Sequence, residues 1–152
     1  MIRRLRFLIA LTMLVVIGAA TATTASAGGR KVFDAQLTGI PTAGLALFGV
    51  TGGGVPWVID EGQATLTADG QLNVEVEGLV LATTHVNPVA TGRAIVACAG
   101  VVAASTGAVP FSSTGDAEVH TTVSLPSPCL APAVFFAGIT GGGDRWFAVT
   151  GF

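Results

Sequence analysis

Three side chains that could bind a metal ion alternate along one stretch of the sequence: Asp116, Glu118 and His120. In an extended strand, residues two apart point to the same face about 7 Å from one another, so all three would project from one side. Carboxylates and imidazoles bind divalent cations, but at that spacing these groups do not converge on one ion by themselves. A neighbouring strand would have to add ligands, for which Glu75 and Glu77 are available. The alternative is an ordinary solvated strand face.

Evidence for catalysis is weak. The two histidines, His85 and His120, have no spacing typical of a zinc site, and the sequence has no Gly-x-Ser-x-Gly motif. Nine acidic residues always include some pair at a distance suited to glycoside hydrolysis, which reflects their number and not a pattern. We therefore predict no catalytic residue and no cofactor. The competing hypothesis is a small secreted hydrolase or metal-dependent enzyme that uses Asp116, Glu118 or His120.

Two glycine runs, residues 52–54 and 141–143, could present backbone N–H groups to an anion. Neither is followed by Lys-Ser or Lys-Thr and neither opens a predicted helix, so we interpret both as turns between strands. Each run precedes one of the two tryptophans. Trp57, Trp146 and Phe147 would form a binding platform for a sugar or peptide if exposed, but tryptophan in a small β-sandwich is more often buried in the core.

The chain has two cysteines, Cys98 and Cys129. An even count in a small exported domain predicts one disulfide in preference to two buried free thiols. Closing a loop of about 30 residues would stabilise the fold by about 3 to 4 kcal/mol. No base is placed beside either cysteine by the sequence, so we do not predict a catalytic thiol.

Residues 1–27 have the pattern of a secretory signal peptide: three arginines among the first six residues, an apolar segment at 7–20, and Ala25-Ser26-Ala27 at the end. About 14 apolar residues fall short of the roughly 20 that span a bilayer, so we expect cleavage before Gly28 and no membrane anchor. The mature chain would be a single domain, residues 28–152, secreted or at the cell surface, with no further transmembrane segment.

Cleavage at this point changes the charge of the protein. Four basic residues would remain against nine acidic ones, a net charge of −5. A mildly acidic protein is a poor ligand for nucleic acid or anionic lipid, which attract clustered Lys and Arg. We expect an extracellular protein or glycan as partner. Because few charges are available to protect strand edges, self-association is a further alternative.

Residues 62–81 carry the clearest structural signal. Apolar and polar residues alternate on both sides of Asp69-Gly70, and this dipeptide suits the positive φ angles of a tight turn. The pattern predicts a β-hairpin.

The rest of the chain continues this alternation without a helical period. Further strands are predicted at residues 31–37, 55–59, 92–102, 115–125, 133–139 and 145–152, with a short apolar run at 45–50 and a loop at 103–114. Both faces of 92–102 are apolar, which predicts an interior strand. In 115–125, the inward face would carry Ala117, Val119, Thr121, Val123 and Leu125. We predict an all-β fold, an antiparallel β-sandwich of about eight strands, with a small β-barrel as the alternative.

Several of these runs together resemble the strand order of CHRD-type extracellular domains, β-sandwich modules of chordin and of secreted bacterial proteins. They are FDAQL at 33–37, GQATL at 62–66, LNVEVEGL at 72–79 and GRAIV at 92–96, with Asp69-Gly70 and His85. The resemblance covers about half of the mature chain. The chain has one histidine where that family has His-x-His, and residues 144–146 only echo its closing strand.

The chain is also similar to small uncharacterised secreted bacterial proteins with PWVI near the start, here 56–59, and WFAVTGF at the end, here 146–152. Both resemblances imply a secreted β-domain and neither supplies a catalytic residue. The sequence thus favours an exported, non-catalytic domain that acts in extracellular binding or structural interaction.

Overall fold

A computed structural model describes residues 29–151 of the chain, and the predicted signal peptide at 1–27, Gly28 and Phe152 lie outside them. The described part is all-β, as predicted, and its strands pair antiparallel. Eight strands follow one another in a continuous sheet in the order β10-β8-β12-β13-β1-β5-β6-β11, and β9 also pairs with β8. The strands are β1 (Lys31–Gly39), β2 (Ala46–Leu47), β3 (Val50–Thr51), β4 (Trp57–Val58), β5 (Glu61–Thr67), β6 (Gln71–Glu77), β7 (Val80–Leu81), β8 (Thr91–Cys98), β9 (Val101–Ser105), β10 (Val109–Pro110), β11 (Ala117–Thr122), β12 (Ala133–Thr140) and β13 (Gly143–Thr150).

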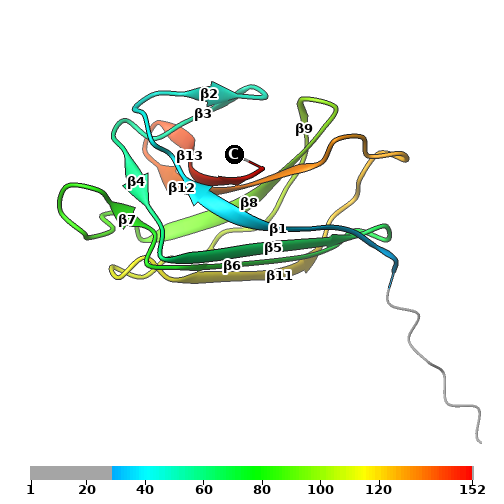
Figure 1. The fold of residues 1–152 in the computed structure, drawn as a ribbon, viewed down its shortest axis with the longest axis horizontal. Helices are drawn as coiled ribbons and strands as arrows, with labels where there is room; N and C mark the ends of the chain where they lie inside the picture. Colours follow the sequence, from blue (N-terminus) through cyan, green and yellow to red (C-terminus); the bar gives the residue numbers. More distant parts are fainter. Residues whose placement is uncertain (1–28, 152) are drawn as a thin grey trace, which may run out of the picture.

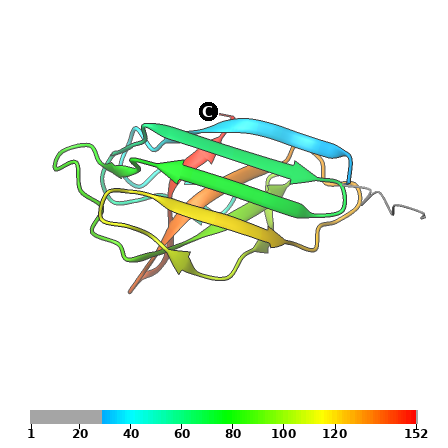
Figure 2. The same ribbon diagram turned by 90° about the horizontal axis from the view of Figure 1, so that it is seen from below.

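The sheet curls because β1 takes part in both of its halves. The first part of β1 pairs with β5, where Phe33 lies opposite Leu66, and its last part pairs with β13, where Leu37 lies opposite Thr150. One layer consists of β1, β5, β6 and β11, and the other consists of β8, β12 and β13 (Figure 1). Seen from the first layer, β12 crosses behind it at an angle (Figure 2). The fold is therefore a curled antiparallel sheet, intermediate between a sandwich and a barrel.

The predicted hairpin at 62–81 is confirmed as β5 and β6 up to Glu77, but its last residues leave it, since Val80 and Leu81 form β7 and pair with β4. Gly70 adopts a φ of 86°, which only glycine reaches without strain. On the inner face, Ala64, Leu66, Leu72, Val74 and Val76 are all buried. Alternate residues of both strands face solvent, as the period of two requires.

The predicted single strand at 92–102 is wrong, because the chain reverses at Ala99 and Gly100. These residues have φ angles of 52° and 79°, so β8 ends at Cys98 and β9 returns beside it. The expected loop at 103–114 contains the rest of β9 and all of β10. Gly100 suits this reversal, but an alanine in the left-handed region is rare, so Ala99-Gly100 does not resemble the usual hairpin turns such as Asn-Gly or Asp-Gly. The interior position of β8 is confirmed, since β12 pairs with one side of it and β9 and β10 with the other.

Two other predicted strands are shorter than expected. The apolar run at 45–50 is a small hairpin, β2 and β3, that turns at Phe48 and Gly49 with φ angles of 50° and 81°. The strand predicted at 115–125 is ordered as β11 over 117–122 only, and Thr121 is exposed although its alternation predicts an inward side chain.

Aromatic side chains fill the core between the two layers. Trp57 stacks on Phe147 with ring centroids 3.8 Å apart and planes 10° from parallel. Phe111 stacks against both rings and meets Phe136 edge to face. Trp146 is also buried, and its indole N–H donates to the Leu45 carbonyl at 3.0 Å. The tryptophans and Phe147 are therefore core residues and do not form a surface platform.

Candidate functional site

The solvated face of β1, β5, β6 and β11 holds two of the three metal candidates. Glu118 lies opposite Glu75 of β6, and His120 lies opposite Asn73. The imidazole Nδ1 of His120 is 3.0 Å from the amide oxygen of Asn73, and its Nε2 is 3.5 Å from the Glu118 carboxylate. The period of two thus places Glu118 and His120 on one face, with Glu75 on the neighbouring strand.

Asp116 belongs to a different group of contacts. Its carboxylate accepts hydrogen bonds from the Thr114 hydroxyl at 2.5 Å, the Ser112 hydroxyl at 3.0 Å and the Gly78 N–H at 3.1 Å. The Thr114 hydroxyl, then the Gly78 N–H and the Ser112 hydroxyl, hold the pKa of Asp116 below its usual range. Asp116 therefore ties the loop before β11 to the turn after β6.

Residues 29–151 contain no group of three or more His, Cys, Asp or Glu side chains placed to hold a metal ion. His85 is in the loop between β7 and β8, where it is exposed and has a φ of 52°. Within the described part of the chain, neither His85 nor His120 is hydrogen-bonded to a serine. The two histidines thus contribute to no shared site there.

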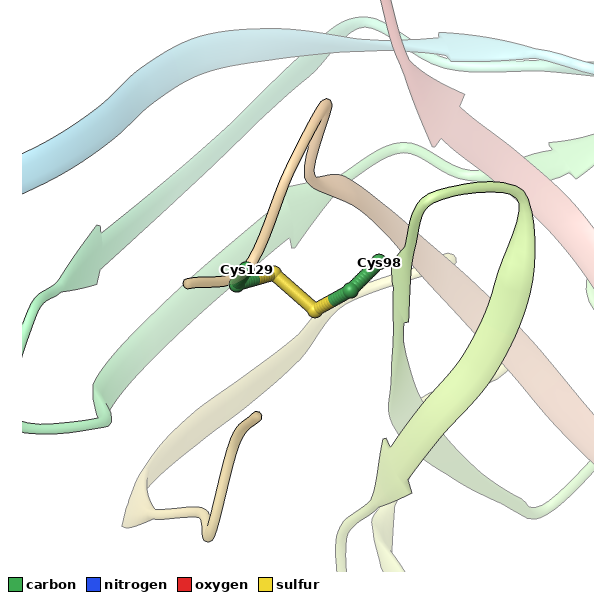
Figure 3. The surroundings of a disulfide bond; sticks show 2 residues. All are labelled: Cys98 and Cys129. Atoms are coloured by element: carbon green, nitrogen blue, oxygen red, sulfur yellow. A yellow bond between two sulfur atoms is a disulfide. The ribbon is translucent and has the colours of Figure 1, made fainter. Parts of the chain in front are cut away.

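The predicted disulfide is present. Cys98 and Cys129 are bonded, with Cα atoms 5.1 Å apart and a sequence separation of 31 (Figure 3). Next to it, the Ala99 N–H donates to the Leu130 carbonyl at 2.6 Å. These bonds attach the segment between β11 and β12 to the turn between β8 and β9.

The same segment forms one wall of a cavity at this end of the sheet, which we call the end cavity. Its volume is about 430 Å³, within the range of small-molecule sites, about 300 to 1,000 Å³. The opposite wall is the turn between β5 and β6, and the Val123 N–H donates to the Gly70 carbonyl at 2.8 Å where the walls meet. The cavity is lined by Arg30, Val32, residues 66–70 and residues 123–129.

Two charged side chains stand at the end cavity. Asp69 accepts a hydrogen bond from the Thr67 hydroxyl, which, with backbone N–H groups including that of Gly29, holds the pKa of its carboxyl below the usual range. Gln71 donates a further bond to it at 3.3 Å. Arg30, in contrast, makes no ion pair with any residue of 29–151. Of the two charged groups, the one without an ion-pair partner in this part of the chain is therefore the positively charged Arg30.

A second hollow, of about 420 Å³, lies beside β1 and the start of β5. Its charged lining groups are Asp60 and Glu61, and no basic residue accompanies them. The end cavity offers a ligand both apolar lining residues and a cation, Arg30, that has no ion-pair partner in the described part of the chain, so it is the better candidate site.

None of the residues that line the end cavity was predicted from the sequence to be functional. Three segments distant in sequence build it, and each has an ordinary local pattern: the start of β1, a hairpin turn, and a proline-containing segment that marked only the end of a strand. The Asp69-Gly70 turn, Val123, Leu125 and Cys129 had been named individually, all for structural reasons.

No helix among residues 29–151 is long and apolar enough to cross a bilayer. Comparison of the chain with models of known protein families, with curated proteins and with solved structures gives no match. The resemblance to CHRD-type domains thus stays a prediction that rests on the quoted runs.

Proposed function

We propose that this protein is an exported, non-catalytic binding domain and that the end cavity is its ligand site. The observation that carries the proposal is the cavity itself, about 430 Å³, with apolar residues in its lining and, at its side, the guanidinium of Arg30, which forms no ion pair within residues 29–151. The disulfide between Cys98 and Cys129 supports export, because such bonds persist in oxidising compartments. The signal-peptide pattern at 1–27 supports it independently.

The lining of the cavity defines the class of ligand. Its accessible apolar lining includes Val32 and Leu125, which favour a hydrocarbon or aromatic body. The Arg30 guanidinium favours a carboxylate, which it can hold through two parallel hydrogen bonds. Asp69, already bonded to several donors, would repel a second carboxylate placed on its side. The ligand we propose is a small molecule with an apolar body and one carboxylate.

Isothermal titration of the oxidised domain with aliphatic and aromatic monocarboxylates, each beside its neutral alcohol or amide analogue, tests this proposal. We expect saturable 1:1 binding of at least one carboxylate and weaker binding of its neutral analogue. Ser124→Trp, at an exposed position of the lining, should abolish binding by filling the cavity while the thermal melt is unchanged.

The variant Arg30→Gln tests how much the positive charge of Arg30 contributes to carboxylate binding. It should weaken carboxylate binding by about 10-fold or more, since a charge-assisted hydrogen bond contributes about 1.5 to 3 kcal/mol, and leave the neutral analogue unaffected. Arg145→Gln, in the β12–β13 hairpin and outside the cavity, is the matched control. If no carboxylate binds at millimolar concentration, or if Ser124→Trp binds as the parent does, the end cavity is not the ligand site.

A further inference from the structure

Exposed apolar side chains gather around the disulfide. Val101 is 64% exposed, Leu130 60%, Val102 45% and Phe48 42%. They are neighbours: Val101 lies opposite Cys98 in the ladder, Cys98 is bonded to Cys129 beside Leu130, and the Phe48 ring lies 3.5 Å from where Gly100 would carry a Cβ. We call this surface the apolar patch, and it consists of Phe48, Ala99, Gly100, Val101, Val102, Leu130 and Ala131.

Backbone strain is concentrated at the same place. Four non-glycine residues of 29–151 have positive φ angles, and three of them belong to the apolar patch: Phe48 at 50°, Ala99 at 52° and Ala131 at 43°. This conformation is unfavourable for residues with a Cβ. Strained residues of this kind cluster at binding surfaces, where the surrounding structure holds them. The strain is thus a second, independent indication that the patch makes contact with another molecule.

The apolar patch also includes the start of an open sheet edge. β9 and β10 run one after the other along the outer side of β8, and within residues 29–151 β9 pairs with β8 alone. Figure 1 shows β9 at the rim of the fold, on the opposite layer from β11. β11 is the other edge of the sheet. An edge strand presents unpaired N–H and C=O groups to any second strand.

The two edges differ in how they are protected. Glu118 and His120 project from β11, and charges on an edge discourage pairing with another chain. Residues 94–115, which include all of β9 and β10, contain no charged side chain. The β9 edge is therefore chemically open to pairing, whereas the β11 edge is not.

The charge distribution favours a second copy of this chain as the occupant. With a net charge of −5 after cleavage, two copies repel unless they meet away from their carboxylates. Five of the nine carboxylates lie on β1, β5, β6 and β11, and β9 has none. A second β9 supplies an uncharged strand and an identical apolar patch, and antiparallel pairing about a two-fold axis satisfies both copies equally.

We propose that the mature domain forms a two-fold homodimer in which β9 pairs with β9 and the two apolar patches meet. The eight-strand sheet then continues across the dimer. None of the patch residues lines the end cavity, so this assembly does not occupy the proposed ligand site.

Sedimentation equilibrium and light scattering of the oxidised mature domain, from 1 to 500 µM by design, test the dimer. We expect the mass to rise from one copy to two and stop there. Val101→Lys should keep the domain monomeric over this range, which corresponds to at least a 10-fold weaker association, because each copy would bring an ammonium group into an otherwise uncharged interface. Val101 is largely exposed, so the melt should be unchanged.

Val86→Lys is the control, since Val86 is 50% exposed in the loop after β7 and lies outside the patch. It should dimerise as the parent does. Hydrogen exchange gives a second measurement, in which the β9 amides become more protected as the concentration rises and those of β11 do not. A parent domain that stays monomeric at 500 µM, open-ended assemblies, or a Val101→Lys variant that dimerises normally would each overturn the proposal. A different protein captured on the patch of a monomeric domain would overturn it as well.

Discussion

Removing the disulfide should cost this domain a large part of its stability. The bond between Cys98 and Cys129 closes a loop across a separation of 31 residues. In the chain-entropy model, that loop reduces the freedom of the unfolded chain by an amount worth about 3 to 4 kcal/mol. A domain of this size has about 5 to 15 kcal/mol in total, so the double variant Cys98→Ala/Cys129→Ala should fold but be much less stable.

Urea unfolding followed by tryptophan fluorescence measures this loss directly. Trp57 and Trp146 are 4% and 0% exposed, so both should shift to longer emission wavelengths on unfolding. With a denaturant slope of about 2 kcal/mol per molar, the midpoint should fall by about 2 M. The slope itself should rise, because an unfolded chain without the crosslink exposes more surface.

A reductant provides the control. The chain has two cysteines, both in this bond, so dithiothreitol should leave the alanine variant unchanged and shift the parent toward the variant's curve. A loss below about 1 kcal/mol with an unchanged slope would refute the argument from unfolded-chain entropy. It would mean that the unfolded chain is restrained by other contacts.

Three further substitutions, the first with a matched control, test local features of the fold by urea unfolding. Gly115→Ala should cost more than about 2 kcal/mol, because its φ is 91° and an added Cβ would lie 2.4 Å from a backbone nitrogen; Gly107→Ala, with open space around it, should change stability by less than about 1 kcal/mol. Asn87→Ala should cost about 1 to 3 kcal/mol, because a buried amide that makes three hydrogen bonds to backbone groups is lost, and a change under 0.5 kcal/mol would contradict this. Asp116→Asn should cost a few tenths to about 1 kcal/mol at pH 7, since the carboxyl is exposed. The Thr114 hydroxyl lowers the folded-state pKa of Asp116, so its contribution is present above the unfolded pKa, about 3.9, and the difference from the variant should shrink as the pH falls below about 4. A difference that grows there would show the opposite shift.

The sequence by itself determined those features that depend on neighbours along the chain. Strict alternation around Asp69-Gly70 leaves one face of β5 and β6 apolar, and burying that face specifies both the hairpin and its register. The disulfide followed from the cysteine count and from the expected compartment. The shared face of Glu118 and His120 followed from the period of a strand alone.

Other features depended on contacts between distant segments. Asp116 does not join Glu118 and His120, although the alternation predicts one shared face, because hydroxyls and an N–H from two loops bind its carboxylate. The chain reverses at Ala99 although alanine does not favour a turn, and there the bond to Leu130 and the adjacent disulfide hold the strained conformation. A periodic pattern records which face a residue occupies, not which segment covers it.

The end cavity and the apolar patch are consequences of the tertiary structure for the same reason. Both form around the segment between β11 and β12, whose local composition indicates only the end of a strand. The curl that places this segment beside the β5–β6 turn arises where β1 passes from β5 to β13. Local chemistry therefore determined the strands of this protein, whereas its candidate binding surfaces were decided by the packing of segments up to about a hundred residues apart, from Arg30 to Cys129.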